Sequence, residues 1–243
     1  MKENRYDDEE FFAQYSRFPR SVEGLTAAGE WYELEKLLPD FKDKRVLDLG
    51  CGFGWHCRYA AEHGAAAVVG TDLSEKMLAE ARVRNAHPNI TYACVAMEDL
   101  DYPRESFDVA LSSLAFHYVE DFPLVCRKIW DCLAPGGVLV FSCEHPVFTA
   151  YGSQDWYYGE DGKPLHWPVD RYFTEGRREA RFLGCDVVKY HKTLTTYVDT
   201  LLDTGFVLTR LVEPRPDPRL LDVPGMADEL RRPMMLLVSA RKP

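Results

Sequence analysis

Val46-Leu47-Asp48-Leu49-Gly50-Cys51-Gly52-Phe53-Gly54 is the stretch of the sequence that decides the fold. Its first four residues are typical of a short buried strand, and three alternating glycines follow at once. Glycine lacks a Cβ atom, so the backbone can turn sharply there and a ligand can lie against it. A helix is predicted from about Trp55 to His63, and its amide dipole points at that ligand. The stretch therefore predicts a strand, a ligand-binding loop and a helix.

The alternation of strand and helix continues after this stretch. Ser74 is predicted to cap the second helix. The other elements are predicted as strands at about 67–71, 90–95, 107–112, 138–142, 206–212 and 234–240, and as helices at about 122–133 and 193–204. Such alternation indicates right-handed crossovers between parallel strands. We expect an α/β fold with a Rossmann-like, seven-stranded, mostly parallel sheet, helices on both faces and an antiparallel edge strand.

The whole chain, residues 1–243, is predicted to form a single domain. Its parts are a helical N-terminal cap (1–40), a ligand-binding core (41–143), an aromatic-rich insertion after the fifth strand (144–190) and a C-terminal helix with two strands (191–243). Within the core, Pro135-Gly136-Gly137 is predicted to turn the chain before the fifth strand.

The composition argues against several classes of protein. The formal net charge of −10 provides no general cationic field, so we expect no nucleic-acid partner. The chain has no run of about 18 apolar residues, so no membrane span is predicted, and residues 1–10 are too polar for a signal peptide. The seven cysteines are scattered and odd in number, so we expect reduced thiols, no metal site and a cytoplasmic location.

Two acidic residues accompany the glycine loop. Asp72 ends the second predicted strand, where its carboxylate can accept hydrogen bonds from both hydroxyls of a ribose. Asp48 precedes the loop and can hold loop amides or meet a cationic amino group. A dinucleotide fingerprint needs its last glycine at position 55, where this chain has Trp55. A nicotinamide cofactor fits the strand, loop and acid, but Trp55 speaks against it.

The pattern Asp48-x-Gly50-x-Gly52-x-Gly54 with Asp72 resembles the class I S-adenosylmethionine-dependent methyltransferases of the methyltransferase type 11 kind. The resemblance runs from about residue 40 to 145. It includes the fourth-strand motif at 106–113 and the turn at 133–137. It implies that S-adenosylmethionine is the cofactor and S-adenosylhomocysteine the product. It also implies that the loop cradles the methionine part and that Asp72 binds the ribose.

The resemblance also implies a set of cofactor-binding residues. The segment 96–100 resembles the family's adenine edge, but Ala96 stands where the family often has Asp, which leaves the Met97 amide and the side chain of Glu98 or Asp99. Family members often close the cofactor site with an N-terminal helix, which here offers Tyr15 and Arg20. The full predicted set is Tyr15, Arg20, Asp48, Gly50, Cys51, Gly52, Gly54, Asp72, Leu73, Met77, Met97, Glu98 and Ser113.

The catalytic candidates come from position, because this family shares no universal catalytic residue. Ligands of such sheets bind outside the carboxyl ends of the strands, and a hydroxyl or amine acceptor must lose a proton there. The candidates are His117 after the fourth strand, Glu144 and His145 after the fifth, and His191 at the start of the next helix. His145 ranks first, because a Glu-His pair at a strand end is costly without a role. Each histidine also fits a purely structural role.

Eight aromatic residues lie between residues 148 and 173. We interpret this segment as a lid and substrate pocket, with a dimer interface or a satellite core as the alternative. The leading function is transfer of a methyl group to an O, N or C atom of a small molecule by a monomer or homodimer. A nicotinamide-dependent oxidoreductase and a cofactor-binding protein without turnover are the alternatives.

Overall fold

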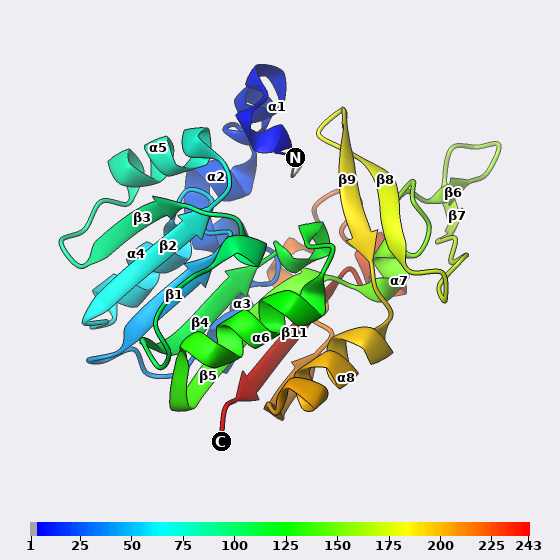
Figure 1. Cartoon of the computed structure of the whole chain (residues 1–243). Coiled ribbons are helices and arrows are strands. Elements are labelled where there is room, and N and C mark those ends of the chain that lie inside the picture. The colour runs from blue at the N-terminus through cyan, green and yellow to red at the C-terminus, as the bar shows by residue number, and fades with distance from the viewer. Residues whose placement is uncertain (1–3) are drawn as a thin grey trace.

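The computed structural model describes residues 4–243, and its centre is a seven-stranded sheet (Figure 1). The strand order is β10-β11-β5-β4-β1-β2-β3. The bounds are β1 (Arg45–Leu49), β2 (Ala67–Asp72), β3 (Ile90–Cys94), β4 (Phe107–Ser113), β5 (Leu133–Glu144), β10 (Val207–Val212) and β11 (Met235–Arg241). β11 runs antiparallel to β5 and β10, and the other strand pairs are parallel. The predicted Rossmann-like sheet with an antiparallel edge is confirmed.

Helices cover both faces of the sheet. Their bounds are α1 (Glu9–Tyr15), α2 (Pro19–Glu23), α3 (Trp31–Leu34), α4 (Trp55–Glu62), α5 (Glu75–Arg84), α6 (Phe122–Cys132), α7 (Pro146–Thr149) and α8 (Leu194–Thr204). Successive side chains of a strand point to opposite faces. In β1, Val46 packs in the apolar cluster with α3, α4 and α5, whereas Leu47 and Leu49 pack in the cluster with α6 and α8. Because β1 to β5 are parallel, their carboxyl ends lie at one common edge of the sheet, between these two helical layers.

Side-chain caps fix the starts of the helices. Ser74 accepts a hydrogen bond from the Met77 amide and starts α5, as predicted. Thr193 does the same for α8. The prediction that His191 opens this helix is wrong, because His191 is the last residue of strand β9 (Cys185–His191). Lys192 and Thr193 separate the end of β9 from the first residue of α8.

The predicted turn at Pro135-Gly136-Gly137 is instead a bulge within the long strand β5. The pairing of β5 with β4 jumps from Phe107–Leu133 to Val109–Val138. Gly136 supports this bulge with a left-handed backbone at φ +78°. The chain therefore continues along the sheet instead of reversing.

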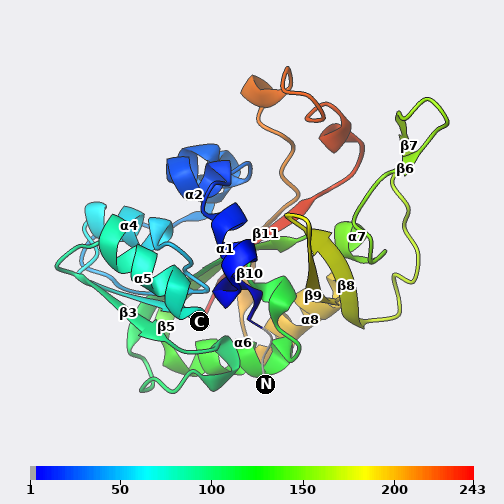
Figure 2. The same cartoon turned by 90° about the horizontal axis from the view of Figure 1, so that it is seen from above.

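The N-terminal cap lies over the carboxyl edge of the sheet. Pro19 separates α1 from α2 and is the first residue of α2. Two short 3-10 turns, η1 (Arg5–Asp7) and η2 (Gly24–Ala27), flank α1 and α2. Figure 2 shows α1 between α5 on one side and the strands β8 and β9 on the other. The cap thus bridges two halves of the molecule.

The insertion contains two β-hairpins that the sequence did not predict. They are β6 (Tyr157–Tyr158) with β7 (Pro164–His166) and β8 (Gly176–Phe182) with β9. The turn of the second hairpin consists of Leu183 and Gly184, both at positive φ, as a two-residue hairpin turn requires. Its tip reaches the N-terminal cap, where the ring centroids of Phe182 and Phe11 lie 6.0 Å apart.

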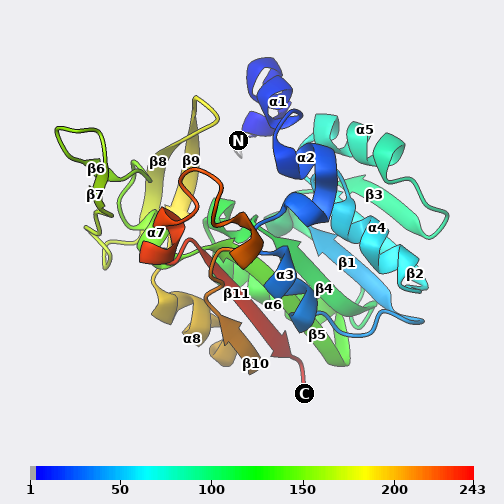
Figure 3. The same ribbon diagram turned by 180° about the vertical axis from the view of Figure 1, so that it is seen from behind.

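Most of the aromatic segment lies away from the glycine loop. Figure 3 shows β6 and β7 projecting from the body, with the C-terminal segment beside α7. Arg232 lies 4.7 Å from the Phe148 ring centroid, 5.4 Å from that of Trp156 and 4.1 Å from that of Trp167. Phe173 is 91% exposed. The aromatic rings around Arg232 therefore form a satellite core, and the part of the insertion that reaches the N-terminal cap is the β8–β9 hairpin.

Candidate active site

The glycine loop after β1 is held tightly at the carboxyl edge of the sheet. The amides of Gly50 and Cys51 both donate to the carbonyl oxygen of Thr71, at 2.8 and 2.9 Å. Gly50 has φ +69°, and a Cβ atom there would lie 2.6 Å from the Ala115 Cβ and 2.8 Å from the Met97 Cε. A side chain at position 50 would therefore fill the space that the loop keeps open.

Gly54 has a packing role at the start of α4. Its φ is +79°, and a Cβ atom would lie 2.3 Å from the hydroxyl oxygen of Tyr92 in β3. Tyr92 in turn donates to the carbonyl oxygen of Asn85. The structure thus explains the third glycine by helix–strand packing, whereas our prediction gave it a cofactor contact.

Gly54→Ala is expected to lower the free energy of unfolding by about 1–2 kcal/mol through backbone strain and by a further 1–3 kcal/mol or so through the collision with Tyr92. Gly136→Ala is the matched control, because φ there is +78° and no atom lies within 4 Å of the added Cβ. Urea unfolding of both variants separates the two contributions. Equal losses for the two variants would rule out the Tyr92 contact as a cause.

Asp72 lies at the end of β2, directly below the loop. Its Oδ2 accepts from the Gly52 amide and its Oδ1 from the Ser74 amide, each at 2.9 Å. Burial raises the pKa of Asp72, and the nearby Asp7 carboxylate adds to the effect. These bonds hold both oxygens of the carboxylate between the loop and the start of α5.

The N-terminal cap reaches the same place with residues that the sequence analysis missed. Asp7 Oδ1 accepts from the Ser74 hydroxyl at 2.5 Å and from the Lys76 amide at 3.2 Å. The Asn4 side chain donates to the carbonyl oxygen of Leu73 at 3.2 Å. The cap is therefore attached to the N-terminal end of α5, beside Asp72.

A cavity of about 50 Å³ lies between the loop and α2. Its lining residues are Tyr15, Arg20, Ser21, Gly24, Leu25, Gly50, Cys51, Gly52, Phe53, Trp55, His56 and Ser113. Arg20 donates to Glu30 Oε1 at 2.6 Å and to the Ser113 hydroxyl at 2.8 Å. Within residues 4–243, the buried atoms Glu30 Oε2, Ser21 Oγ and His56 Nε2 have no hydrogen-bond partner. Ser21 and His56 line the cavity, so two of these atoms give it spare capacity for a polar ligand.

The charges around this cavity are fixed by burial and pairing. Burial alone would raise the pKa of Glu30, but the Arg20 charge outweighs it and lowers that pKa. Burial, together with Arg20, lowers the pKa of His56 to about 4. At neutral pH the Arg20 cation and the neutral His56 imidazole line the cavity, and the Glu30 anion pairs with Arg20. This set complements an amino acid group, which carries both a carboxylate and an ammonium.

Three further predicted residues surround the loop. The Met77 Cε would lie 3.3 Å from a Cβ atom on Gly52, and the Met97 Cε would lie 2.8 Å from a Cβ atom on Gly50. Glu98 follows Met97 in η4 (Met97–Asp99). The structure therefore brings α5 and η4 together around the loop, as the predicted site requires.

Asp48 lies beneath the loop instead of facing the cavity. Its carboxylate accepts from the thiol of Cys57, in the first turn of α4, at 3.1 Å. Burial raises the pKa of Asp48 to about 7, although the Cys57 hydrogen bond opposes this rise. An unfolded aspartate titrates near pH 3.9 or so.

Between these two pH values the folded chain holds a proton that the unfolded chain has lost. The free energy of unfolding therefore falls as pH rises from about 4 to about 7, and this group changes it no further above that. Relative to Asp48→Asn, the wild type should lose about 2–3 kcal/mol between pH 5 and pH 8 in urea unfolding. Asp108→Asn is the control, because Arg45 lowers the pKa of Asp108 and its difference should stay constant over this range. A constant difference for Asp48→Asn would contradict the prediction.

His117 and Glu144 meet at the carboxyl ends of β4 and β5. The Glu144 amide donates to His117 Nδ1 at 3.3 Å, and His117 Nε2 lies 3.9 Å from Glu144 Oε1. Two residues that the sequence analysis missed hold the carboxylate. Lys189 donates to Glu144 Oε1 at 2.5 Å and to Gln154 Oε1 at 2.7 Å, and Gln154 donates to Glu144 Oε2 at 2.7 Å.

The protonation states of this cluster follow from burial and pairing. Burial lowers the pKa of His117 to about 4, so the ring is neutral at pH 7. Burial alone would raise the pKa of Glu144, but His117 and Lys189 together lower it, so the carboxylate is charged. Because His117 Nδ1 accepts a hydrogen bond, we assign the ring proton to Nε2, which points the donor toward Glu144.

His145 and His191 have structural positions. His145 Nδ1 accepts from the Val147 amide and caps α7, and its Nε2 lies 2.9 Å from Glu213 Oε1. His191 Nδ1 lies 2.7 Å from the Thr149 hydroxyl, and its Nε2 lies 2.8 Å from the carbonyl oxygen of Tyr172. Three of these four partners lie in the insertion, and the fourth, Glu213, directly follows β10. The geometry favours His117 and Glu144 over the predicted first choice, His145.

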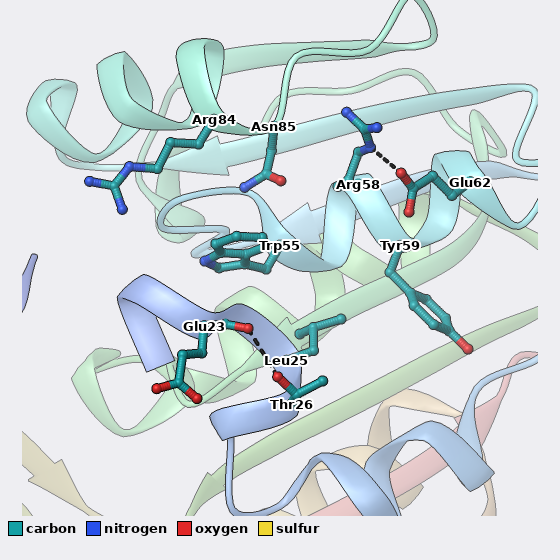
Figure 4. Close-up of a pocket in the computed structure, with 9 residues that line it drawn as sticks. All are labelled: Glu23, Leu25, Thr26, Trp55, Arg58, Tyr59, Glu62, Arg84 and Asn85. Atoms are coloured by element: carbon teal, nitrogen blue, oxygen red, sulfur yellow. Dashed lines mark hydrogen bonds and ion pairs between the residues drawn. The ribbon is translucent and has the colours of Figure 1, made fainter. Parts of the chain in front are cut away.

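A second pocket, of about 360 Å³, lies on the other side of Trp55 (Figure 4). It shares Leu25 and Trp55 with the cavity beside the loop. Its charged residues make contacts of their own, since Arg58 pairs with Glu62 at 2.5 Å and Arg84 pairs with Glu80 at 2.5 Å. Two other lining residues contact the loop residue Phe53, because Arg84 lies 4.8 Å from its ring centroid and the Asn85 side chain donates to its carbonyl oxygen at 2.7 Å.

Residues 4–243 contain no group of three or more His, Cys, Asp or Glu side chains that could hold a metal ion. In the same residues, no helix combines the length and apolar character needed to cross a membrane.

Comparison with known proteins places these features in context. Residues 47–141 match the family model described as a methyltransferase domain. A crystal structure from Mesorhizobium loti, described as an S-adenosylmethionine-dependent methyltransferase, superposes with a TM-score of 0.83 at 46% identity, over 90% of this chain and 100% of that chain. A Listeria monocytogenes protein provisionally assigned to the same activity gives a TM-score of 0.86 at 57% identity, over 90% and 99%.

Two sequence relatives differ in how much of them is matched. An uncharacterised protein of Haemophilus influenzae is 34% identical over 98% of this chain and 96% of its own length. A ubiquinone biosynthesis O-methyltransferase of Neisseria meningitidis is 32% identical, but the match covers 58% of this chain and 65% of that protein.

Proposed function

Since the chain belongs to the class I S-adenosylmethionine-dependent methyltransferases, we propose that its methyl acceptor is a small molecule bound over the ends of β4 and β5. The observation that carries this proposal is the cover over the site. Tyr6 of the cap and Tyr118 of η5 (Phe116–Tyr118) meet with their hydroxyl oxygens 3.2 Å apart. Phe11 of the cap packs against Phe182 of the β8–β9 hairpin. A roof built from two sides favours a small acceptor over a protein or nucleic acid.

The residues present fit S-adenosylmethionine. Arg20 is placed for the carboxylate of the methionine part and Glu30 Oε2 for its ammonium. Asp72 offers two oxygens for the ribose hydroxyls, and the loop has no side chain at Gly50 to obstruct the ligand. When bound, this cofactor supplies a methyl group on a positively charged sulfur.

The protein's own part in the reaction is positioning. Ser113 links the cofactor cavity to the acceptor site at the ends of β4 and β5. It accepts a hydrogen bond from Arg20, and its hydroxyl oxygen lies 3.1 Å from that of Ser142 in β5. The cap excludes water by covering both regions, which shields the reacting groups. Because the roof is attached to both α5 and the hairpin, we expect the cap to open for the acceptor and to close again for transfer.

Calorimetry and a transfer assay test the proposal. S-adenosylmethionine and S-adenosylhomocysteine should both bind to the purified protein. With methyl-labelled S-adenosylmethionine and a deproteinised cell extract, label should enter the low-molecular-mass fraction. Binding without any labelled small molecule, or label found only in added protein or RNA, would contradict a small-molecule acceptor.

A further inference from the structure

A buried polar cluster lies next to the cofactor cavity and consists of Glu144, Lys189, Gln154 and His117. Ser142 and Glu144 are two residues apart in β5, so their side chains lie on the same face, about 6.6 Å apart along the strand. Ser142 contacts Ser113, which contacts Arg20 in the cavity. Ser142 and Ser113 therefore connect the cluster to the cavity that is proposed for the methionine part of the cofactor.

The hydrogen bonds of the cluster leave two groups with unused capacity. A carboxylate has about four acceptor positions. Lys189 and Gln154 occupy one on each oxygen of Glu144, so each oxygen can accept another bond. His117 Nε2 carries a proton, and its distance of 3.9 Å from Glu144 Oε1 is too long for a hydrogen bond. An oxygen atom of a ligand about 2.8 Å from each of them would bridge this distance with two hydrogen bonds.

We propose that this cluster binds the hydroxyl group of an uncharged acceptor, and that Glu144 is its general base. This inference rests on the proposed function and specifies the acceptor for the same site. A hydroxyl is both a donor and an acceptor. It can donate to Glu144 Oε1 while it accepts from His117 Nε2–H, which matches the two unused positions.

The charges of the cluster select against the other common acceptors. Lys189, of which 3% is exposed, places a positive charge 2.5 Å from Glu144 and repels an ammonium. The Glu144 carboxylate repels a carboxylate acceptor in the same way. An uncharged hydroxyl meets neither penalty, because the buried ion pair is already close to neutral overall.

The transfer step balances without another reactant. The acceptor O–H bond breaks and its proton passes to Glu144, while the oxygen forms a bond to the methyl carbon. The C–S bond breaks with its electron pair left on sulfur, which becomes uncharged. Lys189 and Gln154 are positioning residues, since they fix both oxygens of the base and make no contact with the reacting atoms in this scheme.

Glu144→Gln tests the base, because it keeps the size of the side chain and removes the charge. The rate of label transfer from S-adenosylmethionine into the small-molecule extract should fall about 100-fold or more. Binding of S-adenosylmethionine, measured by calorimetry, should stay within about twofold. Glu213→Gln is the matched control, because it makes the same change in the other carboxylate that lies beside a histidine, and it should keep the wild-type rate.

A test of Lys189 must distinguish a role in positioning the base from a role in folding. Lys189→Met should lower the rate, raise the KM of the acceptor recovered from the extract and allow slow methylation of a positively charged amine such as benzylamine. The wild type should not methylate benzylamine. Unchanged discrimination in a folded Lys189→Met variant would contradict the role of this charge.

The chemical bond in the labelled product decides the acceptor class. A methyl ether should retain its label in mild base and show methyl on oxygen by mass spectrometry. A base-labile methyl ester, an N-methyl product, or a Glu144→Gln variant with the wild-type rate would overturn the hydroxyl inference and leave the proposed function intact. Cofactor binding without any labelled small molecule would instead overturn the proposed function, and the inference with it.

Discussion

Replacement of Asp72 by alanine is expected to weaken the binding of S-adenosylmethionine at least about 100-fold. Two charge-assisted hydrogen bonds to the ribose are lost, and each contributes about 1.5–3 kcal/mol. The loop also loses support, because the amides of Gly52 and Ser74 both donate to this carboxylate. Isothermal titration calorimetry with S-adenosylmethionine measures the change directly.

Two other variants separate the charge of Asp72 from its effect on the fold. Asp72→Asn keeps an acceptor for the loop, so it should bind more weakly than the wild type but more tightly than Asp72→Ala. Asp108→Asn removes a carboxylate at the opposite edge of the sheet, where it pairs with Arg45, and should leave the affinity unchanged. Thermal unfolding shows whether each variant is folded. Wild-type affinity in a folded Asp72→Ala protein would disprove the ribose contact.

The cofactor half of the site could be predicted because its residues follow each other closely in the sequence. Gly50 and Gly52 directly follow β1, and Asp72 ends the next strand. A buried parallel strand followed by a glycine turn leaves few possible geometries, so local sequence indicates the position of the loop. The capped start of α5 could be predicted for the same reason.

The acceptor half could be predicted only in part, because distant segments complete it. His117 and Glu144 were predicted from their positions at strand ends, but Lys189, which reaches Glu144 across 45 positions of sequence, was not. Lys189 shares the buried face of β9 with Val187 and His191, a period of two that signals a strand. This alternation was the sequence signal for β9 that our prediction did not use. It also shows why a charged residue on that face is buried and paired.

Arg178 illustrates the same limit. The sequence places it in a basic cluster with Arg177 and Arg181, and three such charges usually form a solvated face. In the hairpin, alternate residues of β8 point inward, so Arg178 is buried while its two neighbours in the cluster are exposed. Its guanidinium donates to the carbonyl oxygens of Ala150 and Thr174. Only the partner strand and the preceding loop decide which of the three charges is structural.

Arg20→Met is expected to have the second largest effect on the cofactor, a loss of about 10- to 150-fold in S-adenosylmethionine affinity. The variant removes the cation that faces the methionine carboxylate and leaves Glu30 buried without its partner. Removing one member of a buried ion pair costs about 3–5 kcal/mol of stability. The double variant Arg20→Met/Glu30→Gln should recover part of that stability in urea unfolding, because no unpaired charge then remains.

A cofactor analogue isolates the carboxylate contact from this loss of stability. Decarboxylated S-adenosylmethionine lacks the group that Arg20 is placed to bind. The wild type should therefore bind this analogue more weakly than S-adenosylmethionine, whereas Arg20→Met/Glu30→Gln should show a much smaller preference between the two. Calorimetry with both ligands and both proteins gives the coupling energy between Arg20 and the carboxylate. If the double variant and the wild type prefer S-adenosylmethionine by the same factor, Arg20 serves only to neutralise Glu30, and the carboxylate binds elsewhere.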